Sequence, residues 1–185
     1  MNLASIWQRI VKWHGAHVTA NVFQPAPGAS SRQIAALEAT LGLPLPDDFR
    51  QSCSIHDGLN GGFLLYHGEL LALDGISRAW QAQRQAYGDE FDEYEPLELE
   101  GPVKKIWWNR KRIHVTDKDG DHLTLDLDPP SDGNYGQLLD HSHETGPVFI
   151  APSWGAFLEK IADELEAGEY VYDPREMVVA PPGMY

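Results

Sequence analysis

The feature that most constrains the fold is a stretch between residues 103 and 128 in which apolar and polar residues alternate. A period of two predicts β-strands, and the sequence Asp-Lys-Asp-Gly-Asp at residues 117–121 predicts an Asp-Gly turn between them. The alternation also predicts an antiparallel sheet with one buried face and one face exposed to water. The apolar positions include Ile113, Val115, Leu123, Leu125 and Leu127.

Apolar residues recur at helical spacing on both sides of this stretch, and capping residues mark helix ends. Two short apolar runs, residues 63–67 and 69–74, predict a hairpin or a pair of short strands. The order of elements predicts an α+β fold, with a single antiparallel β-sheet flanked by α-helices, formed by one domain over residues 1–185. Helices are expected at residues 6–14, 30–42, 46–58, 77–87 and 153–168, and a further strand at residues 137–140.

A Cys-Ser-Ile-His-Asp-Gly sequence at residues 53–58 has two interpretations. Cys53 and His56 lie about one helical turn apart, so the imidazole could activate the thiol as a nucleophile. No group nearby supplies an oxyanion hole, and an unpaired Cys on an apolar helix face is usually a small buried residue. We therefore expect Cys53 to be buried, and His56 and Asp57 to cap the C-terminus of the helix. A single Cys forms no internal disulfide, so the fold needs no oxidising compartment.

Composition limits the classes of partner. The formal net charge is −14, whereas nucleic acids and anionic membranes select a basic surface, so neither is expected as a partner. This negative charge suits a basic protein partner. The alternative explanation is that the acidity only keeps the protein soluble. No apolar run is long enough to span a bilayer, and Gln8, Arg9 and Lys12 interrupt the place of a secretory signal. We therefore expect a cytoplasmic protein.

The densest charge lies in residues 89–100, which hold seven carboxylates interleaved with aromatic and aliphatic residues. Charge steers a partner and aromatic side chains supply contact energy, so this acidic segment is a candidate partner-binding face. The alternative is neutralisation within the chain by the basic stretch that follows, which contains Lys104, Lys105, Arg110, Lys111 and Arg112. The candidate binding residues are Asp89, Glu90, Phe91, Asp92, Glu93, Tyr94, Glu95, Trp107 and Trp108.

Two motifs look like metal sites but lack ligands. Residues 117–121 begin like a calcium loop, but the Gly is at the fourth position instead of the sixth and no Glu closes the loop. His141 and His143 alternate in an extended stretch before Glu144, but a third His or Cys ligand for zinc is missing. We therefore expect no metal and no cofactor. The enzyme alternative is a metal-assisted hydrolase that uses these three residues with an Asp of residues 117–121.

Three stretches, in this order, are similar to a known family: LEATLGLPLPDDFRQSCSIHDG, WWNRKRIHVTDKDGDHLTLDLDP and APSWGAFLEKIADELEAGEY. Over residues 30–172 the chain resembles the SUKH superfamily, also called the Smi/Knr domain. The resemblance implies an α+β domain with an antiparallel sheet flanked by helices, and it implies no catalytic residues. The chain departs from the family pattern at Arg112, Ile113 and His114, where the family often has another aromatic residue followed by a Pro.

The resemblance implies a non-enzymatic protein-binding module. Many bacterial members are immunity proteins that bind and neutralise polymorphic toxins, and fungal members regulate cell-wall synthesis as interaction modules. The first expectation is an immunity protein whose partner is a basic toxin domain. The alternatives are an intracellular regulator or adaptor of cell-wall synthesis and, ranked below it, the metal-assisted hydrolase.

Overall fold

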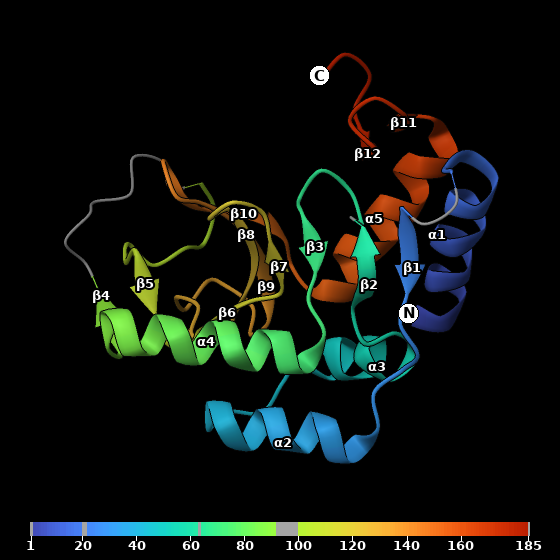
Figure 1. Ribbon diagram of the computed structural model, residues 1–185. Helices are drawn as coiled ribbons and strands as arrows, with labels where there is room; N and C mark the ends of the chain where they lie inside the picture. The colour runs from blue at the N-terminus through green and yellow to red at the C-terminus, as the bar shows by residue number, and fades with distance from the viewer. Residues whose placement is uncertain (1, 20–21, 63, 92–99, 185) are drawn as a thin grey trace.

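The computed structural model describes residues 2–19, 22–62, 64–91 and 100–184, and it confirms the expected α+β class (Figure 1). Local chemistry sets the helix ends. Ser30 forms the predicted capping box with Gln33, and Gly42 ends the same helix in the left-handed conformation that glycine adopts at low cost. The helices are α1 (Leu3–His17), α2 (Ser31–Leu41), α3 (Asp47–Ile55), α4 (Leu73–Tyr87) and α5 (Trp154–Ala167).

The described strands are β1 (Phe23–Pro25), β2 (Leu59–Gly62), β3 (Glu69–Leu70), β4 (Glu90–Phe91), β5 (Trp108–Asn109), β6 (Arg112–His114), β7 (Thr116–Asp117), β8 (His122–Asp126), β9 (Gln137–Ser142), β10 (Gly146–Ala151), β11 (Val171–Asp173) and β12 (Val178–Ala180). Four of them form the main sheet, in the antiparallel order β10-β9-β8-β6. The others pair as β1–β2, β3–β7, β4–β5 and β11–β12. The expected single sheet is therefore corrected to a four-stranded sheet with two-stranded additions.

The turn between β7 and β8 is the predicted Asp-Gly turn, because Asp119 and Gly120 both have positive φ (51° and 98°). A hairpin or a pair of short strands was expected at residues 63–74; the second run contains β3, the described part of the first run (64–67) contains no strand, and the hairpin is wrong. Strand β2 pairs with β1, β3 pairs with β7, and α4 already begins at Leu73. Both strands pair with segments far away in the sequence, which a local pattern does not reveal.

One face of the main sheet is apolar and belongs to the core. Ile113, Leu125 and Leu138 face one another across β6, β8 and β9 and are 0% exposed. Helix α5 contacts β9 and β10, α1 lies beside α5, and α2 packs on α4 (Figure 1). Residues from all five described helices join this continuous core. Among the described residues, no helix combines the length and the apolar character needed to cross a membrane.

The Cys-His-Asp motif makes structural contacts. Cys53 is 6% exposed, and burial raises the pKa of its thiol, which disfavours the reactive thiolate. His56 is the expected C-cap residue of α3, and its backbone N–H donates to the carbonyl of Ser52 (2.9 Å), but the side chains of His56 and Asp57 have partners outside the helix. The Nδ1 atom of His56 donates to the carbonyl of Ala26 (2.9 Å), and Asp57 accepts from the backbone N–H of Leu73, the first residue of α4 (2.8 Å). The motif therefore holds α3, α4 and the segment before α2 together.

The second face of the main sheet is also buried, which corrects the expectation of a face exposed to water. Most of its side chains on β6, β8 and β9 are polar, with Leu139 as an apolar exception, and we call it the polar face. Helix α4 contacts β6, and residues 100–107 hydrogen-bond across the face. The buried polar residues of this face are Arg112, His114, Thr124, Asp126, Gln137 and His141, each at most 6% exposed.

Candidate binding face on the polar side of the sheet

Residues 100–107, which we call the strap, cross the polar face and are held through their main chain. Carbonyl oxygens of alternate strap residues accept hydrogen bonds from the sheet. Such contacts depend on the backbone of the strap and not on the identity of its side chains. The donors and acceptors are Phe149 N to Glu100 O (3.1 Å), Gln137 Nε2 to Pro102 O (2.6 Å), Arg112 Nη2 to Lys104 O (2.7 Å) and Arg112 Nη1 to Ile106 O.

Three polar side chains that hold or adjoin the strap stand in one row across the sheet. Arg112 of β6 is opposite Asp126 of β8, and Asp126 is opposite Gln137 of β9. All three are at most 2% exposed, and Gln137 Nε2 also donates to Asp126 Oδ2 (3.3 Å). Burial raises the pKa of the Asp126 carboxyl and lowers the pKa of the Arg112 guanidinium. Buried charged groups need hydrogen-bond partners, and the strap carbonyls supply those of Arg112.

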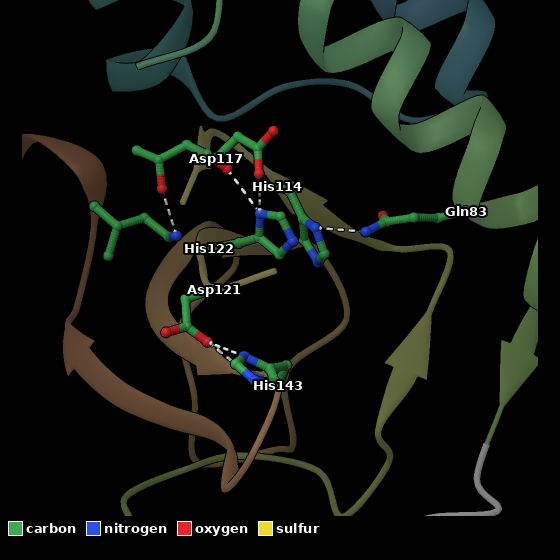
Figure 2. Close-up of polar contacts among 8 residues, drawn as sticks. Gln83, His114, Asp117, Asp121, His122 and His143 are labelled. Carbon is green, nitrogen blue, oxygen red and sulfur yellow. Dashed lines mark hydrogen bonds and ion pairs between the residues drawn. The ribbon is translucent and has the colours of Figure 1, made fainter. Parts of the chain in front are cut away.

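Three imidazoles, those of His114, His122 and His141, lie beside this row, and we call them the histidine cluster. His114 stacks on His122 with ring centroids 4.0 Å apart, and it meets His141 edge-on at 5.7 Å. Figure 2 shows Gln83 of α4 pointing toward His114, with Gln83 Nε2 2.7 Å from His114 Nδ1. His122 Nδ1 donates to the carbonyl of Thr116 (2.9 Å). The cluster therefore joins α4 to three strands of the sheet region.

Two tryptophans pack on the cluster. Trp107, the last residue of the strap, meets His141 edge-on (5.5 Å), and Trp108 meets His114 in the same way (5.8 Å). Burial is the main cause that lowers the pKa of both imidazoles, to about 3 for His141, and the positive charge of Arg112 adds to it. His114 and His141 are therefore neutral at pH 7.

Several buried polar atoms at this face have no hydrogen-bond partner within the described ranges. Leaving such an atom unsatisfied costs about 1–3 kcal/mol. These atoms are His114 Nε2, His141 Nδ1, Thr124 Oγ1 and Gln83 Oε1.

A second His-Asp contact lies at the rim. Asp121 accepts from the backbone N–H and from Nδ1 of His143 (2.9 and 2.8 Å; Figure 2). His143 is exposed while His141 belongs to the cluster, so the two histidines of the suggested zinc site have different partners. In the part of the chain that the structure describes, no three His, Cys, Asp or Glu side chains are grouped so that they could hold a metal ion. Of the residues of the hydrolase alternative, Asp121 and His143 are thus brought together, whereas His141 has other neighbours.

The acidic segment, residues 89–100, is described at its two ends. At its start, Asp89 lies 2.8 Å from Arg84 Nε and 3.8 Å from Arg110 Nε. The backbone of Glu90 and Phe91 forms β4, which pairs with β5. At its end, the carbonyl of Glu100 accepts the first hydrogen bond of the strap. The candidate residues Asp92, Glu93, Tyr94 and Glu95 lie outside the described residues.

Much of the basic stretch after the acidic segment has other partners. Lys104 and Lys111 both pair with Asp128 (2.9 and 3.3 Å), and the guanidinium of Arg112 is bound to the strap carbonyls. Arg110 does contact the segment, through Asp89. Among the described residues, the contact of Arg110 with Asp89 is therefore an example of neutralisation within the chain.

The two candidate tryptophans differ in exposure. Trp108 is 3% exposed, and its indole N–H donates to the carbonyl of Gly88 (3.3 Å), so it is a core residue and is removed from the binding face. Trp107 is half-buried.

Sequence reasoning missed Arg112, His114 and Gln137 as site residues. The polar character of Arg112 and His114 at alternate strand positions was visible, but it predicted exposure to water, and Gln137 was predicted only as part of a further strand.

Comparison with known proteins identifies the family. Residues 28–160 match the SMI1 / KNR4 family (SUKH-1). The chain is 23% identical over 215 residues to the "Glucan synthesis regulatory protein" of Neurospora crassa, which covers 92% of this chain and 40% of that protein. It is 26% identical over 189 residues to the "Cell wall biosynthesis/cell cycle regulator smi1" of Schizosaccharomyces pombe, and the match covers 90% of this chain and 37% of that protein. It is 25% identical over 207 residues to the "Cell wall assembly regulator SMI1" of Saccharomyces cerevisiae, and the match covers 89% of this chain and 40% of that protein.

The chain thus spans about two fifths of the length of these relatives. The family match covers most of the chain and confirms the resemblance that the three sequence stretches carry. The α+β architecture with its antiparallel main sheet agrees with it. This chain therefore belongs to the SMI1/KNR4 family (SUKH-1).

Proposed function

We propose that this chain is a non-enzymatic protein-binding module that regulates a protein partner. The names of its relatives support the proposal, because the three described above are named as regulators of glucan synthesis, of cell-wall biosynthesis and the cell cycle, or of cell-wall assembly. The contacts of the candidate catalytic residues support it as well. Cys53 is a buried thiol, and His141 and His143 have separate partners.

We assign the contact with a basic partner to a face that includes residues 89–100. The observation that carries this assignment is the arrangement of charge around the described ends of the segment. Glu90 and Glu100 are exposed, whereas Lys104 and Lys111 pair with Asp128. Exposed carboxylates that keep their charge increase the rate of encounter with a basic protein.

A regulator of cell-wall synthesis is the form of this function that the relatives' names favour. An immunity protein is the second candidate, and the net charge of −14 favours it. Toxins that act on nucleic acid need a basic surface, which an acidic inhibitor would cover. Co-expression distinguishes the two, because an immunity protein restores growth to cells that produce the captured partner, and a regulator does not.

The binding face is tested with a partner captured by the tagged full chain and then purified. We expect the triple variant Asp92→Asn, Glu93→Gln and Glu95→Gln to associate about tenfold more slowly at low salt and with a weaker salt dependence, because exposed charges act on encounter. The matched control carries the same change of charge on other exposed loops, as Asp119→Asn, Asp132→Asn and Glu144→Gln.

Association rates against salt concentration and urea unfolding midpoints are measured for the wild type and both variants. Equal association rates in the two triple variants would remove the acidic segment from the binding face. A lower unfolding midpoint with unchanged association would instead support neutralisation of the segment within the chain.

A further inference from the structure

We propose that the histidine cluster and the strap form a pH-sensitive switch, in which proton uptake by His114 and His141 releases the strap from the polar face. The strap begins at Glu100, the last residue of the acidic segment, so its release detaches one of the two described anchors of that segment. The consequence for partner binding rests on the proposed function. The physical change takes place within this chain alone.

The histidine cluster and the strap are in direct contact. Trp107 of the strap packs on His141, and His141 meets His114 (5.5 and 5.7 Å between ring centroids). Arg112 donates to two strap carbonyls and lies on the same face of β6 as His114, two residues before it. A change of charge at either imidazole therefore acts on the groups that hold the strap.

The surroundings of His114 and His141 disfavour a positive charge. Helix α4 contributes the uncharged Gln83, and the strap and β5 contribute the two tryptophans. Strand β6 contributes the positive Arg112, which lowers the pKa of both imidazoles. The third imidazole of the cluster, His122, likewise disfavours their protonation, whereas the charge of Asp121 acts in the opposite direction on the pKa of His141 without outweighing burial.

The nearby carboxylates are used by other groups. Asp117 lies 3.8 Å from His122, Asp121 is bonded to His143, and Asp126 accepts from Gln137. Within the described residues, no carboxylate is hydrogen-bonded to His114 or His141. A proton on either ring would therefore produce a buried charge without a bonded counter-charge, and the charge is better solvated after the strap has left.

Four buried polar atoms at the polar face have no protein hydrogen-bond partner among the described residues. They are His114 Nε2, His141 Nδ1, Thr124 Oγ1 and Gln83 Oε1. When the strap leaves, solvent can reach these atoms.

The size of the effect follows from the two protonation equilibria. Burial keeps both imidazoles neutral in the closed form at pH 5.5, whereas an open, solvated imidazole has an ordinary pKa of about 6.5. Between pH 7.5 and pH 5.5, each imidazole therefore raises the equilibrium constant for opening about tenfold. The two together raise it about 100-fold.

Hydrogen–deuterium exchange of the full chain at pH 7.5, 6.5 and 5.5, corrected for intrinsic exchange rates, measures this constant. Amides of the strap report local opening, and amides of α5 report global unfolding. We expect the strap to open about 100-fold more at pH 5.5, while α5 stays better protected than the strap. The double variant His114→Gln/His141→Gln should lose this pH dependence. The control His17→Gln/His143→Gln, which replaces two exposed imidazoles, should keep it.

A pH dependence of the strap that persists in His114→Gln/His141→Gln would overturn the switch, as would strap exchange that rises only together with that of α5. NMR titration of the wild-type imidazole signals provides a test that needs no variant. We expect the closed-state signals of His114 and His141 to stay neutral at pH 5.5, and titration of both near pH 6.5 without strap exchange would also overturn the proposal.

The exchange experiment and the association experiment test the two proposals independently. If the acidic variant associates with the captured partner as fast as its control at pH 7.5, the assigned binding face fails and the exchange result is unaffected. If the acidic variant associates more slowly but strap exchange does not depend on His114 and His141, the switch alone fails.

Discussion

At the scale of residues, single aspartate side chains connect one helix of this protein to another. Asp57, which follows α3, accepts from the first backbone N–H of α4 (2.8 Å), and Asp48 of α3 accepts from the N–H of Gly155 in α5 (2.8 Å). Both contacts satisfy an N–H group that has no partner within its own helix. A negative charge at a helix N-terminus is also favoured by the helix dipole. Each cap is therefore a tertiary contact as well.

Asp57→Ala is expected to lower the free energy of unfolding by about 1 kcal/mol, because the N–H of Leu73 loses its acceptor. Asp57→Asn keeps an acceptor oxygen. Because burial raises the pKa of Asp57, removal of its charge is expected to cost little. Urea unfolding at pH 7.5 compares the three proteins. Equal losses in the two variants would show that the charge, and not the acceptor, stabilises α4.

At the scale of elements, the sequence predicted features that depend on neighbouring residues. The capping box at Ser30 and the turn at Asp119 and Gly120 need only their own residues, and both are confirmed. Burial of the polar face was not predictable in this way, because the strap is held through carbonyl groups that every residue has. For the same reason the alternation of residues 103–128 placed Arg112 on a face exposed to water, although Arg112 and Gln137 both hold the strap.

Arg112→Lys tests how the strap is attached. We expect a loss of about 1–2 kcal/mol in the free energy of unfolding, because a single ammonium group replaces a planar guanidinium that donates to two carbonyls. Exchange of the strap amides should rise more than that of α5. The control Arg78→Lys alters an exposed pair with Asp74 on α4 and should cost less than about 0.5 kcal/mol. Similar losses in both variants would contradict a role of Arg112 in holding the strap.

For the whole molecule, buried ionisable groups set the pH range in which the fold is stable. Burial lowers the pKa of the imidazoles of His14, His67, His114 and His141, which belong to four separate segments. An unfolded chain binds more protons at these groups once the pH falls below about 6.5, so acid reduces the free energy of unfolding. Burial has the opposite effect on carboxyl groups such as Asp126, whose raised pKa makes the folded chain bind the proton first.

His67 isolates one of these contributions, because it lies apart from the strap. Its side chain is 11% exposed and 3.8 Å from Asp140, and burial, together with the charges of Lys118 and Lys160, lowers its pKa to about 4. Between pH 6.5 and 4 the unfolded chain therefore binds a proton that the folded chain does not, which removes about 1.4 kcal/mol of stability per pH unit.

We therefore expect the free energy of unfolding of His67→Gln to fall by about 1.4 kcal/mol less between pH 7.5 and pH 5.5 than that of the wild type. Contributions of other groups are common to both proteins and cancel in this comparison, as does any loss of packing that does not depend on pH. Urea unfolding at the two pH values measures the difference. His17→Gln replaces an exposed imidazole and should follow the wild type. If His67→Gln loses as much stability as the wild type, the His67 imidazole has an ordinary pKa in the folded chain and burial does not control its protonation.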